Sequence, residues 1–322
     1  MKIHIPNSAF LGNLDTFLAS FMPEDGNNLQ VTFNEKWVWV HPIVLSMVSS
    51  LGLDVQKKGG TIICEGMKAK SLNYLERMGL FKFLNAEKRI TVHKHEPSGR
   101  FIPITNIKNS DELKTFIENI VPLLHTTPNQ AEPIKYIVSE LVRNVFEHSK
   151  SDSGAMVCAQ FFKKGNRVSV GVSDVGVGIK KTIQQSYQVQ NDSQAIKLAL
   201  TPGITGTTSR IGGTPLNAGA GLFFIKSIAK VNREFFLIYS GSSSYKLLKT
   251  PAHKKITLNA DPHKDRHSLR EDLPPWHGTA VGVDISLEET QNFKELLELI
   301  RKVYRLDIKE KAKARFKKAK FI

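Results

Sequence analysis

The feature that most constrains the fold of this chain is a helical segment whose polar residues share one side. Glu140, Asn144 and His148 are spaced four residues apart, so a helix would align them in a single polar stripe. Glu140 has the chemistry of a general base, and the amide oxygen of Asn144 has that of a Mg²⁺ ligand. A solvated helix face is the alternative interpretation of this spacing. The apolar residues of the segment recur at helical intervals: Ile134, Ile137, Leu141, Val142 and Val145.

A strand that ends in an acidic residue and two glycines follows this segment. Residues 167–173 alternate as a strand does, and Asp174, Gly176 and Gly178 come directly after them. A residue without a Cβ lets a flat ring approach the backbone closely. A carboxylate can accept a hydrogen bond from an exocyclic amine such as that of adenine, which contributes about 1.5–3 kcal/mol. The pattern therefore predicts a base-binding site at the end of this strand.

A second pair of glycines opens a later helix. Gly219 and Gly221 precede Leu222 and an apolar run, so the free N–H groups at the helix start would face a phosphate. Two common phosphate motifs are excluded. The chain has no GxxxxGK[ST] sequence, and Lys181 occupies the place of the third glycine in a dinucleotide fingerprint.

These motifs, in this order, resemble those of the GHKL superfamily, the ATPases of gyrase and histidine kinase type. The likeness covers roughly residues 127–290 and includes a late Gly-Thr pair, Gly278 and Thr279. It implies an α+β fold, a two-layer α/β sandwich of the Bergerat type, that binds ATP and Mg²⁺. The phrasing from Asn144 to His148 is closest to anti-sigma-factor kinases and histidine kinase ATP domains. The resemblance implies that Glu140 is the catalytic base and Asn144 the Mg²⁺ ligand. It implies that Asp174 binds the adenine amine with Thr279 beside it, and that Gly176 and Gly178 line the base. Gly219, Gly221 and Leu222 would lie at the phosphates.

Two further residues are weaker candidates for phosphate contact. His148 ends the polar stripe, and a packed or solvated helix-end histidine is the alternative. Residues 201–214 are rich in glycine and threonine and are predicted to form an ATP lid. Arg210 in this lid is the candidate for the γ-phosphate, and a solvated arginine is the alternative. A short helix is expected over residues 191–200.

Residues 1–98 are predicted to form a separate small α/β domain. Strands are expected at Leu29–Phe33, Trp37–Val40, Thr61–Cys64 and Ile90–Val92, and helices from Pro42 to about Gly52 and from Leu72 to Met78, with Gly79 as its cap. This part resembles STAS-like domains, the sulfate transporter and anti-sigma antagonist type. Those antagonists carry an Asp-Ser before the first helix, where this chain has His41, so a docking or structural role is expected.

The polar stretch from His93 to Gly99 is predicted to be the domain boundary, and its histidines are expected to be solvated. The ATP-binding domain would span residues 99–290, with a helix over 111–124 capped by Ser110 and hairpin strands at 245–247 and 255–258. A terminal helix over 293–304 and a basic tail would fill residues 291–322. This tail could bind nucleic acid or an acidic protein, and a solvated helix is the alternative.

The composition indicates the cellular compartment and the charge of possible partners, but not the reaction. The 322 residues carry a formal net charge of +15, which favours acidic partners: nucleotide phosphates, nucleic acid, acidic proteins or anionic membrane surfaces. The charge does not choose among them. Cys64 and Cys158 each lie in an apolar run and form no CxxC pair, so buried thiols are expected and a zinc site is not. No targeting signal and no run of about 18 apolar residues is present. A cytoplasmic protein without membrane contact is predicted.

The sequence thus predicts a Mg-ATP-binding ATPase that acts as a nucleotide-dependent switch for a protein partner. Two alternatives stay open: a serine/threonine kinase of the anti-sigma type, and a non-catalytic regulator that binds nucleic acid or a partner. A conventional histidine kinase is not expected, because no phospho-accepting histidine helix precedes the motifs. Homodimerisation is left open.

Overall fold

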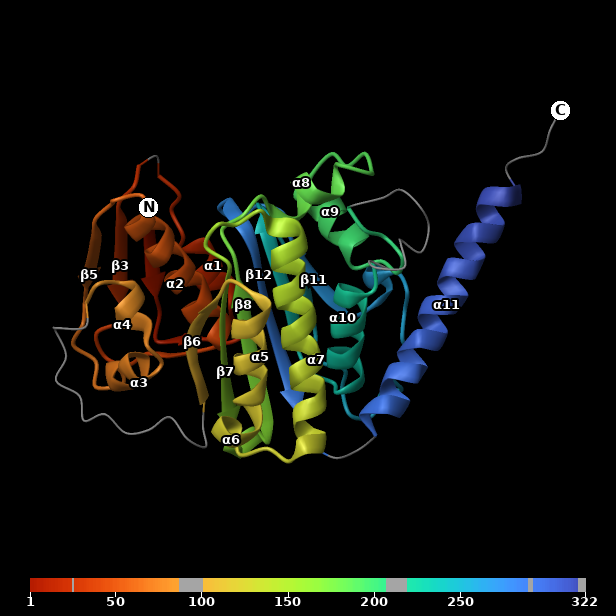
Figure 1. Ribbon diagram of the computed structural model, residues 1–322, viewed down its shortest axis with the longest axis horizontal. Helices are drawn as coiled ribbons and strands as arrows, with labels where there is room; N and C mark the ends of the chain where they lie inside the picture. Colours follow the sequence, from red (N-terminus) through yellow and green to blue (C-terminus); the bar gives the residue numbers. More distant parts are fainter. Residues whose placement is uncertain (25, 87–100, 207–218, 289–291, 318–322) are drawn as a thin grey trace.

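The computed structural model describes residues 1–24, 26–86, 101–206, 219–288 and 292–317 (Figure 1). The N-terminal region builds a small parallel sheet of order β1-β3-β5 and a short parallel pair, β2-β4. Its strands are β1 (Lys2–Ile5), β2 (Ser8–Ala9), β3 (Leu29–Phe33), β4 (Trp39–Val40) and β5 (Ile62–Glu65). Its helices are α1 (Asp15–Ala19), α2 (Pro42–Lys57), α3 (Leu72–Arg77) and α4 (Leu80–Phe83).

The rest of the chain builds a large antiparallel sheet of order β11-β10-β9-β12-β8-β7-β6. Its strands are β6 (Phe101–Ile107), β7 (Ala155–Phe162), β8 (Arg167–Ser173), β9 (Phe236–Gly241), β10 (Ser243–Leu247), β11 (His267–Arg270) and β12 (Trp276–Ser286). The helices are α5 (Ser110–Glu118), α6 (Ile120–Leu124), α7 (Pro128–Asn144), α8 (Gly178–Ile183), α9 (Asp192–Ala199), α10 (Gly221–Val231) and α11 (Phe293–Lys317). A π-helical turn, Val145–Ser149, extends α7, and 3₁₀ turns lie at Lys163–Gly165 and Pro262–Lys264. The expected α+β class is confirmed.

The two faces of the large sheet belong to two different cores. Successive strand residues point to opposite faces, so alternation along β7 separates the two sets. Met156 and Cys158 join the core of the N-terminal region, whereas Ala155 and Val157 join the core formed with α7 and α10. Helices thus cover the sheet on both faces, with α2 on one and α7 on the other (Figure 1).

Glycine makes the close contact between α2 and the large sheet possible. A Cβ on Gly171 in β8 would lie 2.3 Å from the backbone of Pro42 and Ile43, at the start of α2. Beside it, the thiol of Cys158 donates to the carbonyl of Pro42 at 3.3 Å. A bulkier residue at this position would hold α2 further from β8. Glycine therefore allows the N-terminal region to pack directly on the sheet.

A buried polar group lies next to this contact. His41 precedes α2, and its Nδ1 accepts from the N–H of Ile43 at 3.1 Å. Its Nε2 lies 3.4 Å from Oδ1 of Asp284 in β12, and Ser169 donates to the same oxygen. Burial alone raises the pKa of Asp284, but His41, Arg167 and Ser169 together hold it below its usual value. A buried charge is tolerated only when it is paired in this way.

Most of the helices and strands predicted for the N-terminal region are confirmed, with two errors. The strand at Leu29–Phe33 and the helix after Pro42 are present, and Gly79 has the left-handed φ of 82° expected of its turn. The expected stop at Gly52 is wrong, because α2 continues to Lys57. A Cβ on Gly52 would lie 2.2 Å from the carbonyl oxygen of Phe83, so this glycine permits tight packing and does not end the helix. The strand expected over Trp37–Val40 is only Trp39–Val40. The strand predicted at Ile90–Val92 and the stretch His93–Gly99 lie outside the described residues.

Four predictions for helices and strands in the second half also differ from the structure. The helix predicted over 111–124 is two helices, α5 and α6, with a break at Asn119. Its N-cap is Asn109 rather than Ser110, because the Asn109 side chain accepts from the N–H of Glu112 at 2.9 Å. Residues 255–258 are not a strand, and β11 pairs with β10 instead. The terminal helix is confirmed but longer, since α11 includes most of the basic run and extends beyond the body of the molecule (Figure 1).

Candidate functional site

The polar stripe lies on α7, whose start is fixed by a capping box. The hydroxyl of Thr127 accepts from the N–H of Gln130 at 3.3 Å, and the Gln130 side chain accepts from the N–H of Thr127 at 3.0 Å. The last part of the stripe is the π-helical turn after Asn144, which carries His148. Single π-turns inside helices occur frequently at functional sites. The helix thus brings its polar residues to one side of a cavity.

The carboxylate of Glu140 lies against the start of α10. A Cβ on Gly221, the first residue of α10, would be 2.8 Å from Oε2 of Glu140 and 3.7 Å from Nδ2 of Asn144. Within the described chain, this amide nitrogen is buried and has no hydrogen-bond partner. Two motifs separated by about 80 residues therefore meet at a helix N-terminus, which attracts anions.

Asp174 directly follows β8 and also lines the cavity, and only 3% of its surface is exposed. Its Oδ1 accepts from the N–H of Gly176 at 2.7 Å, and its carbonyl accepts from the indole of Trp276 at 3.2 Å. Its own N–H donates to the carbonyl of Thr279 at 2.9 Å. Burial raises the pKa of Asp174 to about 7, although the backbone amides of Gly176 and Thr279 act to lower it. A buried acceptor with a pKa near neutrality is a typical property of a functional carboxylate.

The glycines of the motifs have different structural roles. Gly178 and Gly219 both have positive φ, 76° and 62°, and both line the cavity. A Cβ on Gly219 would lie 2.4 Å from the carbonyl oxygen of Ile204, so no other residue fits without a backbone shift. Gly176 does not line the cavity. A Cβ there would lie 2.1 Å from the carbonyl oxygen of Ser149, so Gly176 lets the end of the π-turn pack against β8.

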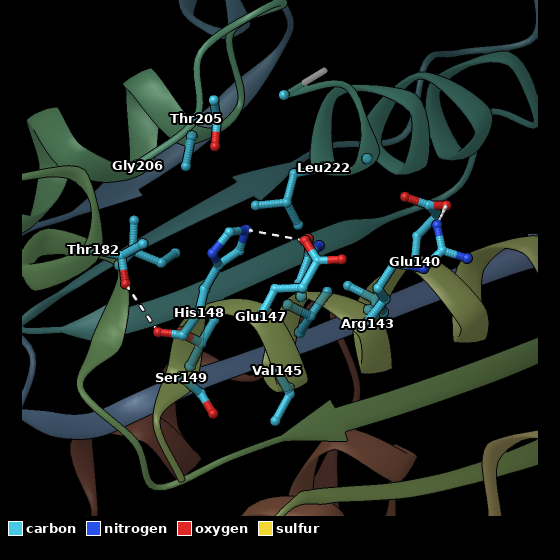
Figure 2. A pocket seen from close by; sticks show the side chains of 18 of the residues that line it. Glu140, Arg143, Val145, Glu147, His148, Ser149, Thr182, Thr205, Gly206 and Leu222 are labelled. Carbon is cyan, nitrogen blue, oxygen red and sulfur yellow. Dashed lines mark hydrogen bonds and ion pairs between the residues drawn. The ribbon is translucent and has the colours of Figure 1, made fainter. Parts of the chain in front are cut away.

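The cavity between these groups has a volume of about 390 Å³. This volume is within the range of small-molecule sites, roughly 300–1,000 Å³. Figure 2 shows Glu140 and Arg143 at one side of the pocket and His148 with Thr182 at the other. The predicted residues that line the cavity are Glu140, Asn144, His148, Asp174, Gly178, Gly219, Gly221, Leu222 and Thr279. Arg210 and most of the predicted lid lie outside the described residues.

The pKa values of Glu140 on α7 and His148 on the following π-turn are shifted in opposite directions. Burial raises the pKa of Glu140, the nearby charge of Glu147 raises it further, and Arg143, whose Nη1 is 3.2 Å away, lowers it. Burial lowers the pKa of His148, and Glu147, whose Oε2 is 3.7 Å from the ring, opposes this. Glu140 is thus a stronger base than a solvated carboxylate, and His148 favours its neutral form.

Several residues that line the cavity were not predicted from the sequence. Tyr136 and Arg143 lie on α7, Thr182 on α8, and Arg301 on α11. Tyr136 is four residues before Glu140, so the spacing of the polar stripe could have identified it. No spacing could have identified Arg301, because its position depends on how α11 packs.

In the described part of the chain, no helix is both long and apolar enough to cross a membrane. No family model matches the sequence, and no curated protein matches it.

Proposed function

We propose that this protein binds Mg-ATP in the cavity between α7, α10 and the end of β8, and that it is an ATPase that switches a protein partner. The strongest support is that residues of three separate motifs line the same cavity. These residues are Glu140, Asp174 and Gly221. The resemblance of these motifs to the GHKL superfamily supports a Bergerat-type fold, preceded by a STAS-like unit.

Asp174 would accept a hydrogen bond from the exocyclic amine of adenine. The N–H of Gly176 donates to the side chain of Asp174. Gly278, in β12, has a positive φ of 101°. A Cβ on Gly278 would lie 2.2 Å from the carbonyl oxygen of Asp174. This close packing fixes the acceptor before any ligand arrives, so little entropy is lost on binding.

The phosphates would lie at the start of α10, where Glu140 and Asn144 meet Gly221. An amide oxygen and nearby phosphates suit Mg²⁺, which keeps several waters and takes few protein ligands. Asn144 would contribute that oxygen. Glu140, with its raised pKa, would accept a proton from an attacking water.

Incubation with ATP labelled at the γ-phosphate tests this function, with and without a chelator of Mg²⁺. The expected result is release of labelled phosphate by the wild-type protein with Mg²⁺, and its loss in Glu140→Ala, which should still bind ATP. Label transferred to a serine or threonine of a co-purified protein would support the kinase alternative instead. Failure of the wild-type protein to bind ATP at millimolar concentration would contradict the proposal.

A further inference from the structure

The C-terminal helix α11 supplies a charged residue to the wall of the cavity. Arg301 lines it together with Arg143, which lies on α7. The two guanidinium groups act on the same neighbour, Tyr136. Burial and the charge of Glu140 raise the pKa of the Tyr136 hydroxyl, and both arginines act to lower it. Arg301 thus lines the same cavity as Tyr136, Glu140 and the start of α10.

The backbone at Arg301 is held in place by apolar packing. Ile300, the preceding residue, is fully buried. One turn later, the ring of Tyr304 packs against Phe223 and Phe224 of α10, with ring centroids 6.4 and 6.0 Å away. On α7, Tyr136 packs against Phe293 at the start of α11, at 5.9 Å. These contacts fix the position of α11 relative to the two helices that form the phosphate end.

The side chain of Arg301 has only a weak competing partner. Nη1 lies 2.5 Å from Oε1 of Glu298, three residues earlier on the same helix, and both side chains are about half exposed. Exposed ion pairs of this kind contribute about 0–1 kcal/mol. A guanidinium donates two parallel hydrogen bonds to a phosphate, which is a stronger interaction. The side chain could therefore exchange Glu298 for a phosphate at little cost.

We propose that Arg301 is a phosphate-binding residue that responds to the terminal phosphate of the nucleotide. This inference rests on the proposed function. The same helix reaches the turn beyond α9, since Nζ of Lys311 donates to the carbonyl of Pro202 at 3.1 Å. A phosphate bound by Arg301 thus stabilises the docking of α11 on α10 and on this turn. The basic outer part of α11 then reports whether ATP or ADP occupies the cavity.

Titration calorimetry with ATP, ADP and adenosine tests this proposal in the full-length chain. We compare wild type with Arg301→Ala, Arg301→Lys and a matched control, Arg305→Ala, which removes an exposed arginine from the same helix outside the cavity. For Arg301→Ala, we expect ATP affinity to fall about tenfold and adenosine affinity to stay unchanged. Arg301→Lys should restore part of the loss, and Arg305→Ala should bind ATP as wild type does.

Equal ATP affinity in Arg301→Ala and wild type would overturn this proposal and leave the ATP site intact. An equal loss for ATP and adenosine would also overturn it, because a phosphate contact does not affect adenosine. If wild type binds no adenine nucleotide, the proposed function fails, and this inference fails with it. Thermal unfolding of each variant checks that the fold is retained.

Discussion

The two ends of the cavity are built differently. At the proposed adenine end, Asp174 is buried and is fixed by hydrogen bonds from Gly176 and Trp276. At the proposed phosphate end, the side chains of Arg143 and Arg301 are about half exposed, and each pairs with a carboxylate on its own helix. If ATP binds as proposed, recognition of the base is set in advance by the core. Contact with the phosphates would then depend on charged side chains that can change partners.

Described residues of the N-terminal region contact the chain next to Asp174, at the proposed adenine end. The hydroxyl of Ser50 on α2 is 2.7 Å from that of Ser173, the residue before Asp174. Trp276, which donates to Asp174, packs against Phe21 with ring centroids 5.8 Å apart. Residues of the N-terminal region thus support the residues around Asp174, at the proposed adenine end. The remaining predictions test this asymmetry between the two ends.

The largest effect is expected where the N-terminal region meets the sheet. Gly171→Ala would place a Cβ 2.3 Å from backbone atoms of α2, which no rotamer change can relieve. We expect the free energy of unfolding in urea to fall by about 3 kcal/mol, in the range of overpacked cores. The control is Gly165→Ala in an exposed turn, where a Cβ meets nothing within 4 Å. Equal stability of the two variants would show that α2 is not docked on β8.

Asp174→Asn should weaken ATP binding by roughly 100-fold, because a hydrogen bond to a charged acceptor is lost. The fold should remain intact. The folded-state pKa of about 7 lies above the usual value of 3.8, so the ionised form destabilises the fold, and stability is lost as pH rises from about 4 to 7. At pH 8 the variant should therefore melt no lower than wild type. Unchanged ATP affinity, measured by calorimetry, would show that the adenine binds elsewhere.

The pH dependence of adenosine affinity tests whether Asp174 is the acceptor at the proposed adenine end. Because the pKa of Asp174 is about 7, the carboxylate is mostly protonated at pH 6 and mostly ionised at pH 8. Adenosine affinity should fall about tenfold from pH 8 to pH 6, since protonation removes the favoured acceptor. Adenosine is the suitable ligand because it carries no phosphate that titrates in this range. The profile of Asp174→Asn should be flat, and a flat wild-type profile would contradict the assignment.

The sequence predicted the parts of the site that lie within single elements. The stripe on α7 and the end of β8 follow from local periodicity, and the structure places Glu140 and Asp174 in one cavity. Contacts between elements were not predictable in this way. At Gly52 and Gly171, a Cβ would lie within 2.3 Å of the backbone of another segment, and a sequence does not show which segment that is. Arg301 was missed for the same reason.

The smallest predicted effect tests whether the N-terminal region influences the adenine end at all. Ser50→Ala removes the hydroxyl partner of Ser173, which should cost about 1 kcal/mol of stability. Since Asp174 is the next residue, we also expect adenosine affinity to fall about threefold through a small shift of the acceptor. The matched control is Ser46→Ala on the same helix, whose buried hydroxyl donates to the carbonyl of Ile43 at 3.0 Å. That variant should lose similar stability without a change in affinity, because its hydrogen bond stays within α2. Equal affinities of the two variants would mean that the N-terminal region stabilises the sheet but does not position Asp174.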